Sequence, residues 1–194
     1  RQAQDGDIYL DETVRRMVTT HRTAVADLAY VLFVEGYSAA RPMTDSITGV
    51  TTEPDMVYAA DRYRKAAEVL DLIQEKLPAS VVPYSIQIGY QIADVYLRLG
   101  QETGDAALTA KGMAILEDEI IRYGAYLPYF RELMRTLPAS GYSGLSVTDR
   151  YVPTYLYVLL QSYTDFGGDT DALSEKLRAN NVNIADLEFF LPSK

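Results

Sequence analysis

The chain has 194 residues, of which 48% are hydrophobic, and this is enough to bury a core without disulfides or metal ions. Its 18 Lys and Arg residues against 27 Asp and Glu residues give a net charge of −9, which argues against nucleic acid or an anionic membrane surface as a partner. Because the chain holds no cysteine, thiol catalysis, cysteine zinc sites and disulfides are excluded, and the redox compartment stays open.

Two features of the sequence bear on its context. The chain begins Arg1-Gln2-Ala3-Gln4, with neither Met nor a basic and then apolar leader, so we expect a piece of a longer or processed protein. The longest apolar stretch, Tyr151 to Leu160, contains Pro153 and is far shorter than the roughly 20 residues that span a bilayer. We therefore expect no membrane-spanning segment in this piece.

The first predicted helix begins at Asp11 and ends at Gly36, within a first-helix region over 1–36. The composition then changes to Ser, Thr, Gly and Pro over 37–53, which predicts an exposed loop. Apolar or compatible residues recur along the helix in steps of three and four, and we expect them to face inward: Val14, Val18, His21, Val25, Leu28 and Leu32.

Three further helices are predicted by the same spacing. The first starts at Pro54 and is stopped by Pro78, the second starts at Pro83 and ends at Gly100, and the third covers 106–123. The residues expected to face inward are Val57, Ala60, Tyr63, Ala66, Leu70, Ile73 and Leu77 in the first, Ile88, Ile92, Val95, Tyr96 and Leu99 in the second, and Ala110, Met113, Leu116, Ile120 and Ile121 in the third.

The region 126–194 is predicted to hold C-terminal helices. They cover 128–136, 147–166 and 169–179, with a Gly and Ser loop over 138–144 and an apolar tail at 189–192 that is expected to dock. No stretch of useful length shows the period of a strand. The sequence therefore predicts an all-α fold.

Two segments show the repeat pattern of tetratricopeptide (TPR) hairpins. Tyr63 to Pro78 matches the second helix of such a repeat, and Ile92 to Gly100 matches the first helix of the next one. Lys111-Gly112 stands where the following repeat continues, after an insertion. We expect a single helical-repeat domain over 1–194, a short α-solenoid of antiparallel TPR-like hairpins with its core at 54–125. The alternative is an ordinary helical hairpin with similar small and large residues.

A set of short motifs indicates a more specific family. They are Ile8-Tyr9-Leu10-Asp11-Glu12, Arg15-Arg16-Met17, Thr20-His21-Arg22, Val82-Pro83-Tyr84-Ser85 after Leu77-Pro78, and the helix from Ala93 to Gly100. Over roughly residues 7–130 the chain resembles the C-terminal soluble region of domain of unknown function family 2723, whose members are similar to protein O-mannosyltransferases of the GT-C class. The loops at 37–53 and 103–111 depart from that family's pattern.

That resemblance has implications for location and role. In the family, a multi-pass, glycosyltransferase-like membrane domain precedes a TPR-like tail. The resemblance implies that this chain is the non-catalytic tail of an integral membrane protein, on the periplasmic side of a Gram-negative inner membrane. The catalytic residues of a GT-C enzyme would then belong to the parent protein and not to this chain.

The polar residues on the first helix have structural interpretations. His21 lies on the predicted apolar stripe with no nucleophile or second ligand near it in the pattern, so we expect a hydrogen-bonded core histidine. Arg15, Arg16 and Arg22 form a basic cluster, which is interpreted as a solvated helix face. The alternative for this cluster is pairing with carboxylates or docking against a parent domain.

The acidic clusters do not predict metal or acid–base chemistry. Asp165, Asp169 and Asp171 lack the spacing of a calcium loop, and we expect Asp169 to cap a helix. The consecutive carboxylates over 117–119 splay around a helix, so they are interpreted as a solvated face and not as a glycosidase pair. We expect no catalytic residue, metal site or cofactor in the chain.

The 16 tyrosines allow two interpretations. Core packing is favoured for the tyrosines over 151–163 and for the group at 84–96, whereas aromatic platforms for a sugar or peptide are the alternative. As candidate groove residues we single out Tyr84, Gln87, Gln91 and Tyr96.

The favoured function is an interaction domain that presents a groove to a protein partner or docks on the parent's membrane domain. The second hypothesis is a carbohydrate-binding helical domain of the cell envelope, suggested by the tyrosine content and the acidic surface. An enzyme in its own right is a third hypothesis without a positive signal in the sequence.

Overall fold

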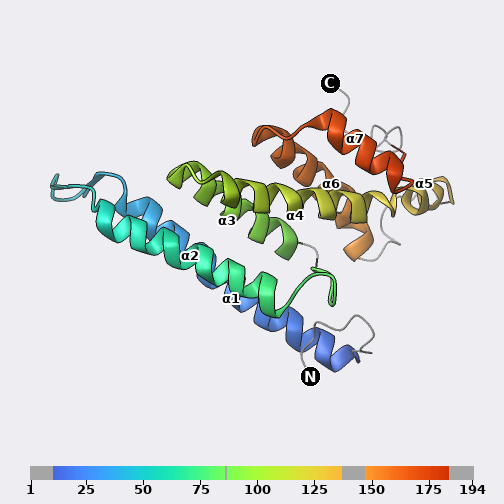
Figure 1. Cartoon of the computed structure of the whole chain (residues 1–194), viewed down its shortest axis with the longest axis horizontal. Coiled ribbons are helices and arrows are strands. Elements are labelled where there is room, and N and C mark those ends of the chain that lie inside the picture. Colours follow the sequence, from blue (N-terminus) through green and yellow to red (C-terminus); the bar gives the residue numbers. More distant parts are fainter. Residues whose placement is uncertain (1–10, 86, 137–146, 184–194) are drawn as a thin grey trace. The chain divides into compact units, whose positions relative to one another are not determined.

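The computed structural model of the chain describes residues 11–85, 87–136 and 147–183, and nearly all of its regular structure is helical. This confirms the all-α prediction. The chain divides into two compact units, Arg1–Gly112 and Met113–Lys194, with the boundary inside one helix. The elements labelled in Figure 1 are α1 (Glu12–Ala39), β1 (Met43–Thr44), β2 (Thr51–Thr52), α2 (Met56–Lys76), α3 (Ile88–Thr103), α4 (Ala106–Gly124), α5 (Leu127–Thr136), α6 (Val147–Asp165) and α7 (Thr170–Ala179). The loop expected at 138–144 and the tail at 189–192 lie outside the described residues.

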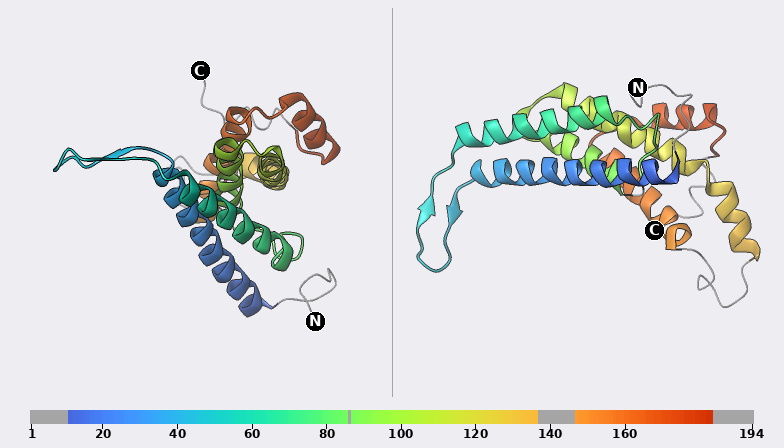
Figure 2. Two further views of the ribbon diagram at one scale, coloured as in Figure 1. Left: turned by 60° about the vertical axis from the view of Figure 1, so that its left-hand side comes forward. Right: turned by 90° about the horizontal axis from the view of Figure 1, so that it is seen from below.

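In the first unit, α1 and α2 run side by side in opposite directions, and a small β ribbon joins their ends (Figure 2). Asp11 caps α1 as expected, but the helix continues past Gly36 to Ala39. The segment 37–53 was expected to be an exposed loop, and residues 42–53 are exposed, whereas 37–39 belong to α1 and 39–41 are half-buried. Its threonines instead support β1 and β2, which pair antiparallel between Met43 and Thr52.

The face that α1 buries differs from the predicted one. Leu32 is buried as predicted and Val18 and Val25 are half-buried, but Val14, His21 and Leu28 are exposed. The rest of the buried side is made of Arg22, Ala26, Ala29, Phe33 and Gly36. Small residues allow α2 to approach closely: a Cβ at Gly36 would lie 2.8 Å from the ring of Tyr63. The inward prediction for His21 was wrong because the buried stripe of α1 runs through Arg22, Ala26 and Ala29, and the stripe that contains His21 lies largely outside it.

The predicted inner faces of α2 and α3 are largely confirmed. Tyr63, Ala66, Leu70 and Ile73 are buried in α2, and Ile88, Ile92, Val95 and Leu99 are buried in α3. At the start of α2, however, Val57 is 83% exposed and Ala60 is also exposed. In α4, Leu116 and Ile120 are buried as expected, whereas Ala110 is exposed.

Gly100 has a different role from the predicted one. The helix α3 continues to Thr103, and the left-handed residue that follows it is Gly104, with φ of 71°. Gly100 is instead buried against α4, where an added Cβ would lie 2.9 Å from the backbone nitrogen of Thr109. The glycine is therefore needed for close helix contact and not for a helix end.

Arg22 fixes α1 to the connection between α2 and α3. Its side chain is 1% exposed, and its guanidinium donates to the backbone oxygens of Leu77 at 2.6 Å and Val82 at 2.9 Å. It also lies 4.6 Å from the centre of the Tyr84 ring. The expectation of a solvated Arg22 was wrong because the proline-containing connection leaves carbonyl oxygens that need donors, and a guanidinium supplies five.

The second unit consists of the end of α4 with α5, α6 and α7. Asp169 caps α7 as predicted, because its carboxylate accepts from the backbone nitrogens of Asp171 and Ala172 at 3.0 Å each. Glu119 was expected to face solvent but is 4% exposed, and its carboxylate pairs with Arg122 at 2.5 Å. The helical position of Glu119 faces the core, so the charge needs this partner.

The tyrosines of α6 divide between core and surface. Tyr155 and Tyr163 are buried, whereas Tyr151 and Tyr157 are exposed. The Tyr163 hydroxyl donates to Glu117 at 3.0 Å and lies 3.1 Å from the backbone oxygen of Asp169. Core packing is therefore the correct interpretation for two of these four residues.

We expect Arg22→Met to lower the free energy of unfolding by about 2 kcal/mol, because it leaves buried carbonyl oxygens without a charged donor. Arg22→Lys should be intermediate, since one ammonium cannot span the same oxygens. Urea denaturation of the full chain measures the effect. Arg16→Met, at an exposed position of the same helix, is the control, and an equal loss in both variants would contradict the role of Arg22.

The buried tyrosines predict a loss of stability at high pH. Burial raises the pKa of Tyr123 and Tyr163 to about 12, whereas tyrosine in an unfolded chain ionises near pH 10. Their contribution to stability is therefore complete below about pH 10 and is lost as the pH rises toward 12. In urea titrations across this range, Tyr163→Phe should show a smaller fall in stability than the wild type. The exposed substitution Tyr151→Phe should match the wild type, and a Tyr163→Phe curve that also matches it would refute the assignment.

Candidate functional site

Two of the four candidate groove residues lie in the interior of the first unit. Tyr84 is 4% exposed, and its hydroxyl accepts a hydrogen bond from the Gln74 amide at 2.7 Å. Tyr96 is fully buried and donates to the carboxylate of Asp71 at 2.7 Å. Burial, followed by this hydrogen bond, raises the pKa of Tyr96. Both rings serve as packing residues with engaged hydroxyls and offer no open surface.

The other two candidates are more accessible, but they do not complete a groove with the tyrosines. Gln87 is exposed and takes a positive φ of 81° directly before α3. Gln91 is half-buried and donates to Asp27 of α1 at 2.9 Å. The four residues therefore contribute to how α3 is seated among its neighbours.

His21 lies at the surface of α1. It lines a shallow hollow of about 290 Å³ together with Thr13, Arg16, Met17 and Thr20. Among the described residues, no group of three His, Asp or Glu side chains lies close enough to hold a metal ion. The hollow therefore offers a single imidazole beside a guanidinium, without a second ligand.

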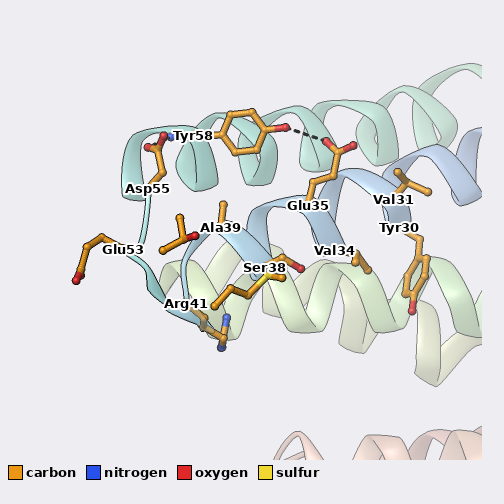
Figure 3. A pocket seen from close by; sticks show the side chains of 12 residues that line it. Tyr30, Val31, Val34, Glu35, Ser38, Ala39, Arg41, Glu53, Asp55 and Tyr58 are labelled. Atoms are coloured by element: carbon orange, nitrogen blue, oxygen red, sulfur yellow. Dashed lines mark hydrogen bonds between the residues drawn. The ribbon is translucent and has the colours of Figure 1, made fainter. Parts of the chain in front are cut away.

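A larger pocket lies between the second half of α1, the β ribbon and the start of α2, and we call it the α1 pocket (Figure 3). Its volume is about 620 Å³, within the usual range for sites that bind ligands. Its lining is mainly apolar, with carboxylates and one guanidinium among the polar groups. The residues used below are Tyr30, Val31, Val34, Met43 and Tyr58, with Glu35, Arg41, Glu53 and Asp55.

Much of the apolar lining comes from side chains of α1 that lie outside its buried face. Tyr30 and Val34 are four residues apart and share one side of the helix, and Val31 lines the pocket from the α2 side of α1 (Figure 3). Val31 is 50% exposed, Tyr30 is 46% exposed, and Met43 of the ribbon is 64% exposed. Side chains of this size rarely gather in the open on a soluble protein unless they meet a partner.

Arginine side chains cover two tyrosine rings at the edge of the pocket. The guanidinium of Arg41 lies 3.3 Å from the centre of the Tyr37 ring and pairs with Glu102 at 2.8 Å. The guanidinium of Arg62 lies 4.5 Å from the centre of the Tyr58 ring. Each of these rings therefore has one face occupied from within the chain.

The charge at the pocket is negative. Three lining side chains are carboxylates, and Arg41 is the one basic side chain that lines it. The Glu35 carboxylate accepts from the Tyr58 hydroxyl at 3.4 Å and pairs with Arg62 at 3.5 Å. Asp55 caps α2 through the backbone nitrogen of Tyr58 at 2.9 Å but keeps its charge.

The sequence analysis missed this pocket, although α1 carries a signal for it. The run from Leu28 to Val34 is apolar on both sides of the helix, as in a helix covered on both faces. Only Leu28 and Leu32 of this run were predicted to face inward, and the apolar residues beside them were assigned no partner. The β ribbon also lines the pocket, and the sequence analysis did not predict the turn between β1 and β2 that forms this ribbon.

No helix in the described ranges has the length and apolarity needed to cross a membrane. Comparison of the chain with known protein families, curated proteins and solved structures finds no match.

Proposed function

We propose that this chain is a non-catalytic interaction domain of TPR-like helical hairpins that binds a protein segment at the α1 pocket. The observation that carries the proposal is the exposed apolar face of α1, which continues onto the β ribbon. Exposure of apolar surface to water is unfavourable, so a partner that covers this face gains free energy by burying it.

The arrangement of the first unit supports the TPR-like description. Long antiparallel helices pack through small residues, and α3 contacts both α1 and α2, as expected when one hairpin stacks on the next. Gly112 of α4 lies against Leu97 of α3, where an added Cβ would be 2.6 Å from that side chain. Such close contacts are what the small residues of a helical repeat permit.

We propose further that the domain is the periplasmic tail of a GT-C-like membrane protein. This part rests on the resemblance carried by the motifs at 8–12, 15–17 and 20–22. On this proposal, the partner is another envelope protein or the parent's own membrane domain.

Carbohydrate binding has less support from the geometry. Sugars stack on open aromatic faces, but Tyr84 and Tyr96 are buried, and Arg41 and Arg62 cover the rings of Tyr37 and Tyr58. The pocket lining includes the hydroxyls of Ser38, Thr52 and Tyr30, but its surface is mainly apolar and gives a sugar few polar partners.

The proposal predicts position-specific crosslinking in cells that make the natural protein. A photoactivatable phenylalanine analogue replaces Val31 in one variant and Val34 in another, and adducts are identified by mass spectrometry. We expect one and the same protein, or the parent's membrane domain, to be captured from both positions, because both side chains point into the pocket.

Glu68, exposed on α2 outside the pocket, is the control position for the analogue. It should not yield the adduct. The proposal fails if neither pocket position gives a discrete adduct, or if Glu68 captures the same protein with equal yield.

A further inference from the structure

We infer that the α1 pocket takes an amphipathic protein segment whose aliphatic side chains are followed by lysine or arginine. This inference rests on the proposed function and adds the chemistry of the partner. It depends on how apolar and acidic groups are distributed along the pocket.

The aliphatic part of the occupant is set by α1. Val31 and Val34 are half-covered by the protein and line the pocket, and Met43 lines it from the ribbon. A volume of about 620 Å³ accommodates several aliphatic side chains of one segment. Burying these surfaces supplies the main gain on binding.

The basic part is set by the carboxylates that remain without a cation. Arg62 forms an ion pair with Glu35, and Arg41 forms one with Glu102, so these four charges compensate one another. Within the described part of the chain, the Glu53 carboxylate has no ion pair, and the charge of Asp55 is engaged only by a backbone nitrogen. An occupant that carries positive charge is therefore favoured, and an acidic one is repelled.

The two carboxylates that have no cation partner among the described residues lie at one end of the pocket. In Figure 3, Glu53 and Asp55 lie at the end formed by the ribbon and the start of α2, whereas Tyr30 and Val31 lie further back along α1. The occupant should therefore lie along α1 with its basic residues at the ribbon end. This order, and not only the composition, is what the pocket selects.

The test uses two synthetic amphipathic peptides and the full 194-residue chain. One peptide combines a leucine stripe with lysines, and its twin has glutamate at every lysine position. Fluorescence anisotropy measures the binding of each. We expect the lysine peptide to bind, with an affinity that falls as salt is added, and the glutamate peptide to bind at least about tenfold more weakly.

A matched pair of double variants locates the charge effect. Glu53→Gln with Asp55→Asn removes two charges at the pocket, and the asparagine keeps a capping oxygen for α2. Glu12→Gln with Asp11→Asn makes the same chemical change at the opposite end of α1, where Asp11 caps that helix. We expect the first pair to weaken the lysine peptide about fivefold and the second pair to change it less than about twofold.

A third variant tests the apolar part. Val31→Thr with Val34→Thr keeps side-chain shape while replacing methyl groups with hydroxyls, and it should weaken the lysine peptide about fivefold or more. Circular dichroism should show that all variants keep the helical content of the wild type.

Several outcomes would overturn the inference. Equal binding of both peptides with loss in the valine variant would leave an apolar protein-binding site and remove the preference for a basic segment. Equal weakening by the two carboxylate pairs would mean non-specific charge attraction. Displacement of the peptide by neutral oligosaccharides, or a dimer in sedimentation that the valine variant dissociates, would identify a different occupant. Failure of both peptides to bind would refute the basic segment, while the crosslinking in cells separately decides whether the pocket binds protein.

Discussion

Close contact between α1 and α2 determines how the first unit presents its surface. Gly36 of α1 lies against Tyr63 of α2, and the Tyr63 ring stacks on Phe33 of α1 with 5.9 Å between the ring centres. Ala26, Ala29, Ala59 and Ala66 are buried as well, and their small size leaves room for this packing. Several larger apolar side chains of α1 stay exposed outside its buried face, and Tyr30, Val31 and Val34 among them line the α1 pocket.

Two buried charges, those of Arg22 and Glu119, have different kinds of partner. Arg22 is satisfied by backbone oxygens, whereas Glu119 is satisfied by a neighbouring arginine on the same helix. The carboxylates at the ribbon end of the pocket differ, because Glu53 and Asp55 remain at the surface. That contrast separates charges that stabilise the fold from charges available to a partner.

Sequence reasoning predicted the helices well and their orientation less well. Asp11, Pro78 and Asp169 act through local backbone chemistry, and the helix ends that they predict are found within a few residues. The prediction of which face of α1 points inward was wrong because hydrophobic spacing cannot reveal which of two apolar faces packs against a neighbouring helix. The burial of Arg22 depends on contacts between residues far apart in the chain, for which a single sequence has no local signal. The pocket left a partial signal in the apolar run from Leu28 to Val34, but the position of the β ribbon beside it did not.

The way Arg22 is held has a consequence for how this protein can diverge. Its guanidinium donates hydrogen bonds to the backbone oxygens of Leu77 and Val82 and not to their side chains, and every amino acid provides a backbone oxygen. Mutations at the exposed positions of that connection, such as Ser80 and Ser85, can therefore accumulate without breaking these hydrogen bonds, as long as the path of the backbone is kept. Related chains should vary at those positions and still keep an arginine one helical turn before the alanine at position 26.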